Sequence, residues 1–268
     1  MPGGRVVHAY AAAGRSTGSG LALLWHHGSP HTGRLLEPLL GPATERGIRL
    51  VTYARPAYGG STPRPRRDVA SAAQDVTAVA DALGLDRFAV MGASGGGPHA
   101  LACAALLGAR VTAAVTFASP APYDGTDDWF AGMASPGALR SATEGRAARI
   151  RYASTAEFDP AVFTETDWAA LDGPWGALGQ DAGAADAAGP AGLVDDDVAF
   201  VTPWGFDPAA ITAPVLLRHG SEDRMVPVSH AERLARAIPG AELRRSPDGH
   251  VSVLTAYPDA LDWLLEHR

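Results

Sequence analysis

A serine flanked by small residues follows a short apolar run in the first half of the chain. The segment Gly92-Ala93-Ser94-Gly95-Gly96 comes directly after residues 88–91 and directly before an alanine-rich helical pattern. A serine in this strand-to-helix context is typical of a hydrolytic nucleophile, because small neighbours let the strand and the helix approach closely. We therefore predict that the Ser94 hydroxyl projects from the carboxyl edge of a sheet. The Gly95 N–H would then point at a bound oxyanion.

Two other interpretations of this glycine-rich segment are weaker. A dinucleotide-binding fingerprint needs a glycine where Ser94 stands and an acidic residue farther along, but no Asp or Glu occurs between Asp86 and Asp124. The other interpretation is a structural turn whose serine has no catalytic role. It would be favoured only if the sequence lacked a suitable base and acid elsewhere. Residues near the C-terminus supply both.

A histidine and an aspartate follow the last predicted strands in the order that such a serine requires. His250 lies in a loop before the final predicted helix, and its imidazole can accept the serine proton near neutral pH. Asp223 follows the apolar run 215–219, and its carboxylate can fix the tautomer of that imidazole. We predict Ser94, His250 and Asp223 as the catalytic residues. Other acids remain open for the third position: Glu222, Asp248 and, more weakly, Asp124.

A histidine-rich turn completes the candidate site. His27-Gly28-Ser29-Pro30 follows the apolar run 21–26, where a turn can aim a backbone N–H into the site. We expect the N–H groups of Ser29 and Gly95 to form the oxyanion hole. A metal site is the alternative, but the spacing of the nearby histidines fits no familiar zinc pattern and adjacent strand residues face opposite sides. We expect neither a metal nor a cofactor at these histidines: His26, His27 and His31.

The basic residues narrow the possible chemistry. The 268 residues include no lysine, so Schiff-base catalysis, a Ser-Lys dyad and a P-loop lysine are excluded. A net charge of −7 argues against a nucleic-acid partner. The nearest basic cluster is Arg64, Arg66 and Arg67, which we interpret as a solvated loop because it lies among prolines.

Cysteine content and hydropathy bear on the compartment. Cys103 is the single cysteine, which excludes an intramolecular disulfide, and its apolar surroundings predict a buried thiol. There is neither a leader-like N-terminus nor an apolar run long enough to span a bilayer. We expect a cytoplasmic protein that acts on a small molecule, without a membrane partner; its oligomeric state is open.

Short apolar runs alternate with helical patterns, which indicates an α/β fold with a mostly parallel sheet covered on both faces. The predicted strands are residues 21–26, 50–53, 88–91, 111–117, 215–219 and 241–244. The predicted helices are residues 68–83, ended by Gly84, and residues 98–107, 229–238 and 255–266. Ser229 and Glu232 predict a capping box at the start of the third helix.

Residues 122–208 interrupt this alternation with an Ala-, Gly- and Asp-rich stretch that has no strand pattern. We interpret the stretch as a helical cap inserted into a core formed by residues 1–121 and 209–268. It contains four of the six tryptophans, which either line a substrate pocket or fill the core of the cap: Trp129, Trp168, Trp175 and Trp204. We interpret its acidic run, residues 195–197, as a solvated loop.

The ordered motifs resemble the α/β-hydrolase superfamily, closest to its capped members with an H-G-x-P oxyanion turn. The motifs are His27-Gly28-Ser29-Pro30, Arg55-Pro56-Ala57-Tyr58-Gly59-Gly60-Ser61, Gly92 to Gly96, Gly220 to Pro227 and Gly249-His250. The resemblance implies the α/β-hydrolase fold, a catalytic triad and acyl-transfer chemistry. It departs from the family at the turn of residues 55–61, where members often show D-x-P-G-x-G-x-S, so we expect a similar turn with different contacts. Relatives that open epoxides or displace halides use an aspartate nucleophile, so serine at position 94 argues against both activities.

We expect a serine hydrolase of the carboxylesterase type that cleaves an ester or lactone of a small, largely apolar substrate. A proline-type aminopeptidase and a cofactor-free perhydrolase remain open on the same fold. A ligand-binding protein that no longer turns over is the alternative from another class.

Overall fold

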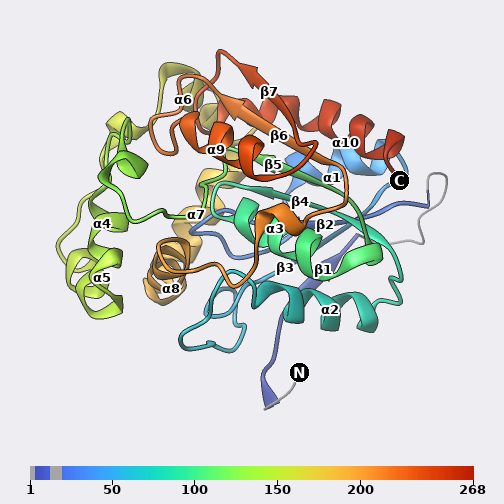
Figure 1. Cartoon of the computed structure of the whole chain (residues 1–268), viewed down its shortest axis with the longest axis horizontal. Coiled ribbons are helices and arrows are strands. Elements are labelled where there is room, and N and C mark those ends of the chain that lie inside the picture. Colours follow the sequence, from blue (N-terminus) through green and yellow to red (C-terminus); the bar gives the residue numbers. More distant parts are fainter. Residues whose placement is uncertain (1–3, 13–19) are drawn as a thin grey trace.

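The structure, a computed structural model, describes residues 4–12 and 20–268. A seven-stranded sheet has the order β1-β3-β2-β4-β5-β6-β7, and all neighbours are parallel except the β1–β3 pair (Figure 1). The strands are β1 (Ala9–Ala11), β2 (Ala22–His26), β3 (Arg49–Tyr53), β4 (Phe88–Ala93), β5 (Val111–Phe117), β6 (Val215–Gly220) and β7 (Glu242–Ser246). The predicted α/β fold with a mostly parallel sheet is confirmed.

The core has two layers because successive strand residues face opposite sides of the sheet. Leu24 of β2 and Val90 of β4 belong to one buried cluster, whereas Leu23 and Met91 belong to the other. Strands that are buried on both faces need apolar residues at nearly every position, so their sequences lack polar alternation. This requirement explains why β2 to β6 were recognisable as apolar runs.

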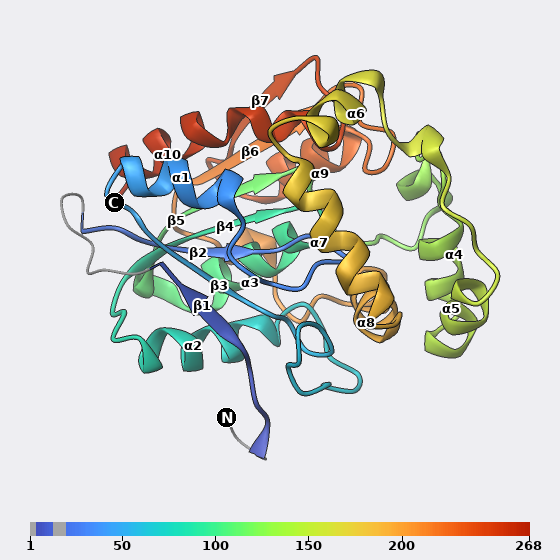
Figure 2. The ribbon, with the colours of Figure 1, turned by 180° about the vertical axis from the view of Figure 1, so that it is seen from behind.

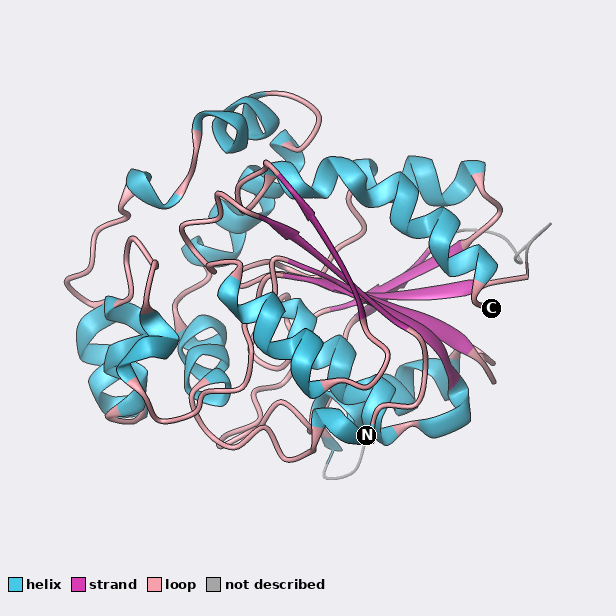
Figure 3. Ribbon diagram, turned by 45° about the horizontal axis from the view of Figure 1, so that its top comes forward, coloured by secondary structure: helices cyan, strands magenta, loops and turns pink. Residues whose placement is uncertain are grey.

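Helices cover both faces of the sheet. The helices α2 (Ala72–Ala82), α3 (Gly96–Leu106) and α9 (Ser229–Ala237) lie on one face, and α1 (Glu37–Glu45) and α10 (Tyr257–Glu266) lie on the other (Figures 1 and 2). Figure 3 shows the twist of the sheet between these two layers. A parallel sheet requires such covering, because neither of its faces is polar enough to lie in water.

The differences from the predicted elements have local causes. The helix α1 was not predicted because it contains prolines, Pro38 in the first turn and Pro42 inside the helix. The strand β1 was not predicted because it has three residues at an antiparallel edge. The capping box at Ser229 is wrong: Ser229 lies inside α9, and the residue at the cap position, Val228, makes no side-chain hydrogen bond. Gly84, with a φ of 65°, follows the end of α2 as predicted.

The segment between β5 and β6 forms a helical insertion beside one end of the sheet (Figures 1 and 3). Residues 122–208, all of them described, contain helices and turns but no strand. The insertion's α-helices are α4 (Gly137–Thr143), α5 (Arg146–Ala153), α6 (Glu165–Asp172), α7 (Gly176–Ala187) and α8 (Ala191–Phe200). Over residues 4–12 and 20–268, none of the helices has the length and apolar character that a membrane crossing needs.

Candidate active site

Ser94 occupies a strained turn between β4 and α3. Its φ is 52°, in the left-handed region that residues with a side chain rarely adopt, and its N–H donates to the Phe117 carbonyl (2.8 Å). Glycines make the turn possible: a Cβ on Gly92 would lie 2.4 Å from the Gly96 carbonyl oxygen, and one on Gly96 would lie 2.0 Å from the His26 carbonyl oxygen. Strain of this kind at a surface-accessible serine is typical of a functional residue.

His250 and Asp223 form a buried hydrogen-bonded pair. His250 follows β7, and its Nδ1 lies 2.8 Å from Oδ2 of Asp223, which follows β6. The second carboxylate oxygen, Oδ1, accepts hydrogen bonds from the N–H groups of Met225 (2.9 Å) and Val226 (2.8 Å). A neutral His250 that donates from Nδ1 to Asp223 keeps its Nε2 as a proton acceptor.

The electrostatics of this pair suit a general base. Burial disfavours the charged imidazole, but the Asp223 carboxylate outweighs that effect and raises the pKa of His250. Burial likewise disfavours the ionised Asp223, yet His250 and the hydrogen bond from His219 hold the pKa of Asp223 well below its usual range. Asp223 therefore remains ionised and can stabilise an imidazolium at His250.

The other acids considered from the sequence lie elsewhere. Asp124 is at the surface, where it pairs with Arg233, and Glu222 is exposed. Asp248 is half-buried, and its carbonyl accepts the Glu222 N–H (3.0 Å). Among the three residues 222, 223 and 248, the carboxylate on His250 Nδ1 is that of Asp223.

The turn after β2 lies beside the turn that carries Ser94. A Cβ on Gly95 would come within 2.5 Å of the Ser29 Oγ and within 2.9 Å of the Phe200 ring, so Gly95 lies between the β2 turn and α8. Asp181 of α7 holds the next part of this turn, accepting from Thr32 N–H (2.9 Å). The two backbone segments predicted to form the oxyanion hole are therefore adjacent in space.

A buried aspartate of the insertion binds the Ser29 side chain. Asp196 in α8 is fully buried, and its Oδ2 contacts Ser29 Oγ (2.5 Å), Arg55 Nη2 (2.7 Å) and the Tyr58 hydroxyl (2.9 Å). Its Oδ1 contacts Arg67 Nη1 (2.5 Å). The two guanidinium groups outweigh the effect of burial and hold the pKa of Asp196 well below its usual range. We call Ser29, Arg55, Tyr58, Arg67 and Asp196 the Asp196 cluster.

Two expectations about charged residues were wrong. Residues 195–197 do not form a solvated loop: all three aspartates lie buried on α8, where Asp195 pairs with Arg146 and Asp197 with Arg149. Arg67 is also buried rather than solvated. Each interpretation failed because it treated a charge as exposed, whereas a buried charge needs a partner that a local sequence pattern does not reveal.

Arg55 connects this cluster to the β2 turn. Its side chain donates to Asp196 and to the carbonyls of His27 and Gly28, and so holds the β2 turn. A buried guanidinium needs a carboxylate partner, and for Arg55 that partner comes from α8, 141 residues away. The sequence analysis did not select Asp196, Asp181 or Arg55, because the residues around each of them give no sign of its distant partner.

The histidines of the β2 turn each have protein partners. His26 Nδ1 contacts the Tyr53 hydroxyl (3.3 Å), His27 Nε2 accepts from Arg55 N–H (3.2 Å) and His31 Nδ1 contacts Asp181 (3.0 Å). In the part of the chain that the structure describes, no group of three His, Cys, Asp or Glu side chains is arranged to hold a metal ion.

The structure does not bring the four tryptophans of the insertion together. Trp129, Trp175 and Trp204 are buried in three different apolar clusters, and Trp168 is 39% exposed beside Phe163. Packing accounts for the three buried indoles. A role for any of the four in a substrate pocket stays a prediction. Cys103 is buried, as predicted.

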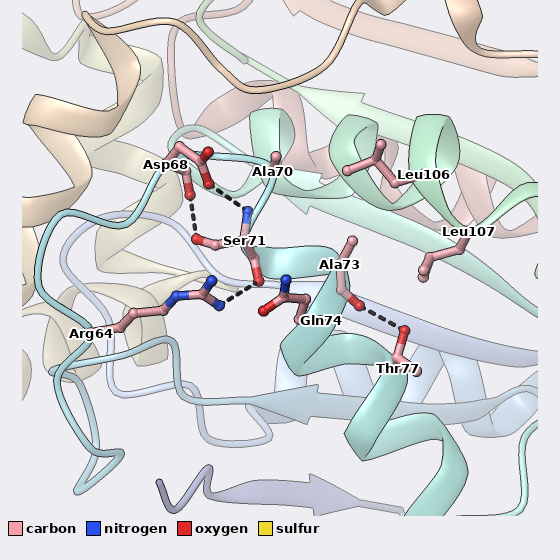
Figure 4. A pocket seen from close by; sticks show the side chains of 9 residues that line it. All are labelled: Arg64, Asp68, Ala70, Ser71, Ala73, Gln74, Thr77, Leu106 and Leu107. Carbon is pink, nitrogen blue, oxygen red and sulfur yellow. Dashed lines mark hydrogen bonds between the residues drawn. The ribbon is translucent and has the colours of Figure 1, made fainter. Parts of the chain in front are cut away.

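An open hollow of about 350 Å³ lies between α2 and the carboxyl end of α3 (Figure 4). It is lined by Arg64, Asp68, Ala70, Ser71, Ala73, Gln74, Thr77, Leu106 and Leu107. Ser94 precedes the other end of α3, and a helix of 11 residues is about 16 Å long. The hollow is therefore about one helix length from Ser94 and is not part of the candidate site.

Comparison with known proteins agrees with this architecture. Residues 22–257 match the family described as the alpha/beta hydrolase fold. The structure is similar to a thermophilic esterase from Thermogutta terrifontis (TM-score 0.71, 22% identity, covering 100% of this chain and 96% of that chain). It is also similar to a bromoperoxidase from Bacillus anthracis (TM-score 0.76, 22% identity, covering 98% of this chain and 96% of that chain). A third similar structure is an enol-lactonase from Burkholderia xenovorans (TM-score 0.72, 19% identity, covering 99% of this chain and 97% of that chain). With the strained serine turn and the match over most of its length, the chain belongs to the α/β hydrolase fold family.

Proposed function

We propose that this protein is a serine hydrolase that cleaves a carboxylic ester or lactone through an acyl-enzyme on Ser94. The observation that carries the proposal is the strained Ser94 turn, combined with the buried His250–Asp223 pair. Both features follow the carboxyl ends of strands in one parallel sheet, which is where α/β folds bind their ligands.

In the proposed first step, Ser94 Oγ attacks the carbonyl carbon of the substrate while His250 Nε2 takes the hydroxyl proton. The bond to the leaving alcohol breaks, and the imidazolium returns that proton to the departing oxygen. Water then attacks the acyl group, with His250 again as the base, and restores the Ser94 hydroxyl. Asp223 stabilises the imidazolium in both halves of the reaction, which agrees with its lowered pKa.

The proposed oxyanion hole consists of the N–H groups of Ser29 and Gly95. The close approach of Gly95 to the Ser29 side chain supports this assignment. Such a donor commonly contributes about 3–4 kcal/mol to stabilisation of the transition state, so the position of the β2 turn matters as much as the triad. Arg55 and Asp196 then support catalysis by holding that turn.

Residues 122–208 are proposed to act as a cap over the site, with residues 1–121 and 209–268 as the core. The Phe200 ring of α8 lies against Gly95, which supports an apolar wall beside the reacting carbonyl.

The similarity to an esterase and an enol-lactonase agrees with a small ester or lactone as substrate. A proline-type aminopeptidase is less favoured, because the aspartates 195–197 are paired with arginines instead of free to bind a substrate amine. The similarity to a bromoperoxidase keeps perhydrolysis on the same acyl-enzyme as a second candidate.

Labelling with a fluorophosphonate probe tests the nucleophile. The protein should label, and the Ser94→Ala variant should not. A screen of p-nitrophenyl esters of graded acyl length, together with lactones and prolyl amides, identifies the substrate class. Absence of labelling in the folded protein contradicts the serine mechanism and favours a binding protein. Turnover of prolyl amides without ester turnover contradicts the proposed substrate class and leaves the nucleophile intact.

A further inference from the structure

A buried carboxylate of the insertion holds the loop that carries His250. Asp167, in α6, is fully buried and lies 83 residues before His250 in the chain. Its Oδ2 accepts a hydrogen bond from the His250 N–H (3.1 Å). Its Oδ1 accepts from the N–H groups of Val251 and Ser252 (both 2.8 Å). One carboxylate thus binds three consecutive backbone donors, beginning with that of the proposed general base.

The close approach of Asp167 depends on the residue before His250. A Cβ on Gly249 would lie 2.0 Å from Oδ2 of Asp167, so only glycine admits the carboxylate at this distance. The Ser252 hydroxyl closes the arrangement, because it donates to Asp167 (2.9 Å) and accepts the Gly249 N–H (2.8 Å). Thr164 adds a capping box with Asp167, which fixes the carboxylate to the first turn of α6. The loop and the helix are therefore built around the same side chain.

We propose that Asp167 is a positioning residue for the reaction, setting where the His250 imidazole lies. The proposal rests on the proposed function, in which His250 is the base. Asp223 sets the rotation of the ring through Nδ1, whereas Asp167 fixes the backbone from which the ring extends. Asp167 accepts six hydrogen bonds from the protein. Because its two oxygens are occupied in this way, Asp167 acts on the reaction through His250 and not by contact with the substrate.

Asp167 also places a negative charge near the imidazole. The charged groups that act on His250 are Asp223, from the turn after β6, and Asp167, from α6. Burial lowers the pKa of His250, and these two carboxylates together outweigh it. Backbone hydrogen bonds overcome the effect of burial on Asp167 itself and lower its pKa, so it is ionised at neutral pH. Removing its charge while Asp223 remains must lower the pKa of His250.

The test compares Asp167→Asn with Glu165→Gln, a matched loss of charge at an exposed position on the same helix. Two quantities are measured: the NMR titration of the His250 ring nitrogens, and the pH profile of ester hydrolysis. In Asp167→Asn, the titration and the acid limb of the profile should move to lower pH. The kcat should fall by about 10- to 100-fold, as expected for a misplaced base, with KM changed much less. In Glu165→Gln, neither the His250 titration nor the pH profile of ester hydrolysis should change.

A folded Asp167→Asn variant that retains the wild-type His250 titration and kcat would overturn the proposal. If that variant does not fold, Ser252→Ala is the second test, because it removes the hydroxyl that donates to Asp167 and accepts the Gly249 N–H, and it keeps the charge of Asp167. Its kcat should fall severalfold without a shift of the His250 titration, and an unchanged kcat would contradict the assignment. Failure of the proposed function has a different signature: the wild-type protein would not hydrolyse any ester, while the His250 titration would still respond to Asp167→Asn.

Discussion

Replacing Asp196 with asparagine tests whether the Asp196 cluster joins the insertion to the core. The substitution keeps the shape of the side chain and removes the negative charge that Arg55 and Arg67 share. Asp196 is fully buried, and the side chains of Arg55 and Arg67 are 1% and 2% exposed. The variant therefore leaves two buried guanidinium groups without the carboxylate that pairs with them, because water cannot replace it there.

The expected loss of stability is large. Removing one partner from a buried ion pair costs about 3–5 kcal/mol. That is a large share of the roughly 5–15 kcal/mol that stabilises a typical folded protein. At about 2–4 °C per kcal/mol for a chain of this size, the Tm should fall by about 10 °C. Because Asp196 also binds Ser29 Oγ, kcat on an ester substrate should fall as well.

The neighbouring Asp195→Asn is the matched control. Asp195 lies on the same helix, but the side chain of its partner Arg146 is 49% exposed, so solvent screens the pair. The control should therefore lose about 1 kcal/mol or less. Urea denaturation of both variants gives the free energies of unfolding, and calorimetry gives the Tm values. A loss in Asp196→Asn no greater than that in Asp195→Asn would refute the argument that the cluster is a buried ionic connection.

Three further predictions concern the site. Asp223→Asn should reduce kcat by about 10⁴-fold, since the imidazole loses both its tautomer partner and its counter-charge; a reduction of less than tenfold in steady-state kinetics would argue that another acid acts. Hydrolysis should be lost as the pH falls through the pKa of His250, because only the neutral imidazole accepts a proton. Since the pKa of His250 is raised, this loss should occur at a higher pH than for an ordinary histidine. A pH–rate profile of kcat/KM with no acid limb would contradict it. Gly96→Ala should lower the free energy of unfolding by about 3 kcal/mol, because the new Cβ would meet the His26 carbonyl. Gly183→Ala, in open space on α7, is the control and should be neutral or stabilising in the same denaturation assay.

The sequence by itself determined the parts of this protein that depend on local chemistry. The inner strands were predictable because burial on both faces leaves only apolar residues. The Ser94 turn was predictable because a Cβ does not fit at Gly92 or Gly96, so the motif records the geometry directly. The order of Ser94, Asp223 and His250 along the chain indicated the family before any contact was known.

The tertiary structure alone decided which charges are buried and what they bind. Asp196 and Arg55 are 141 residues apart, and a local pattern that is acidic or basic gives the same signal whether it faces water or a distant partner. The same reason applies to Asp167 and the loop of His250, and to the choice of Asp223 over Glu222 or Asp248 as the carboxylate on the imidazole. Burial of a charge is a property of two segments brought together by the fold, so no single segment encodes it.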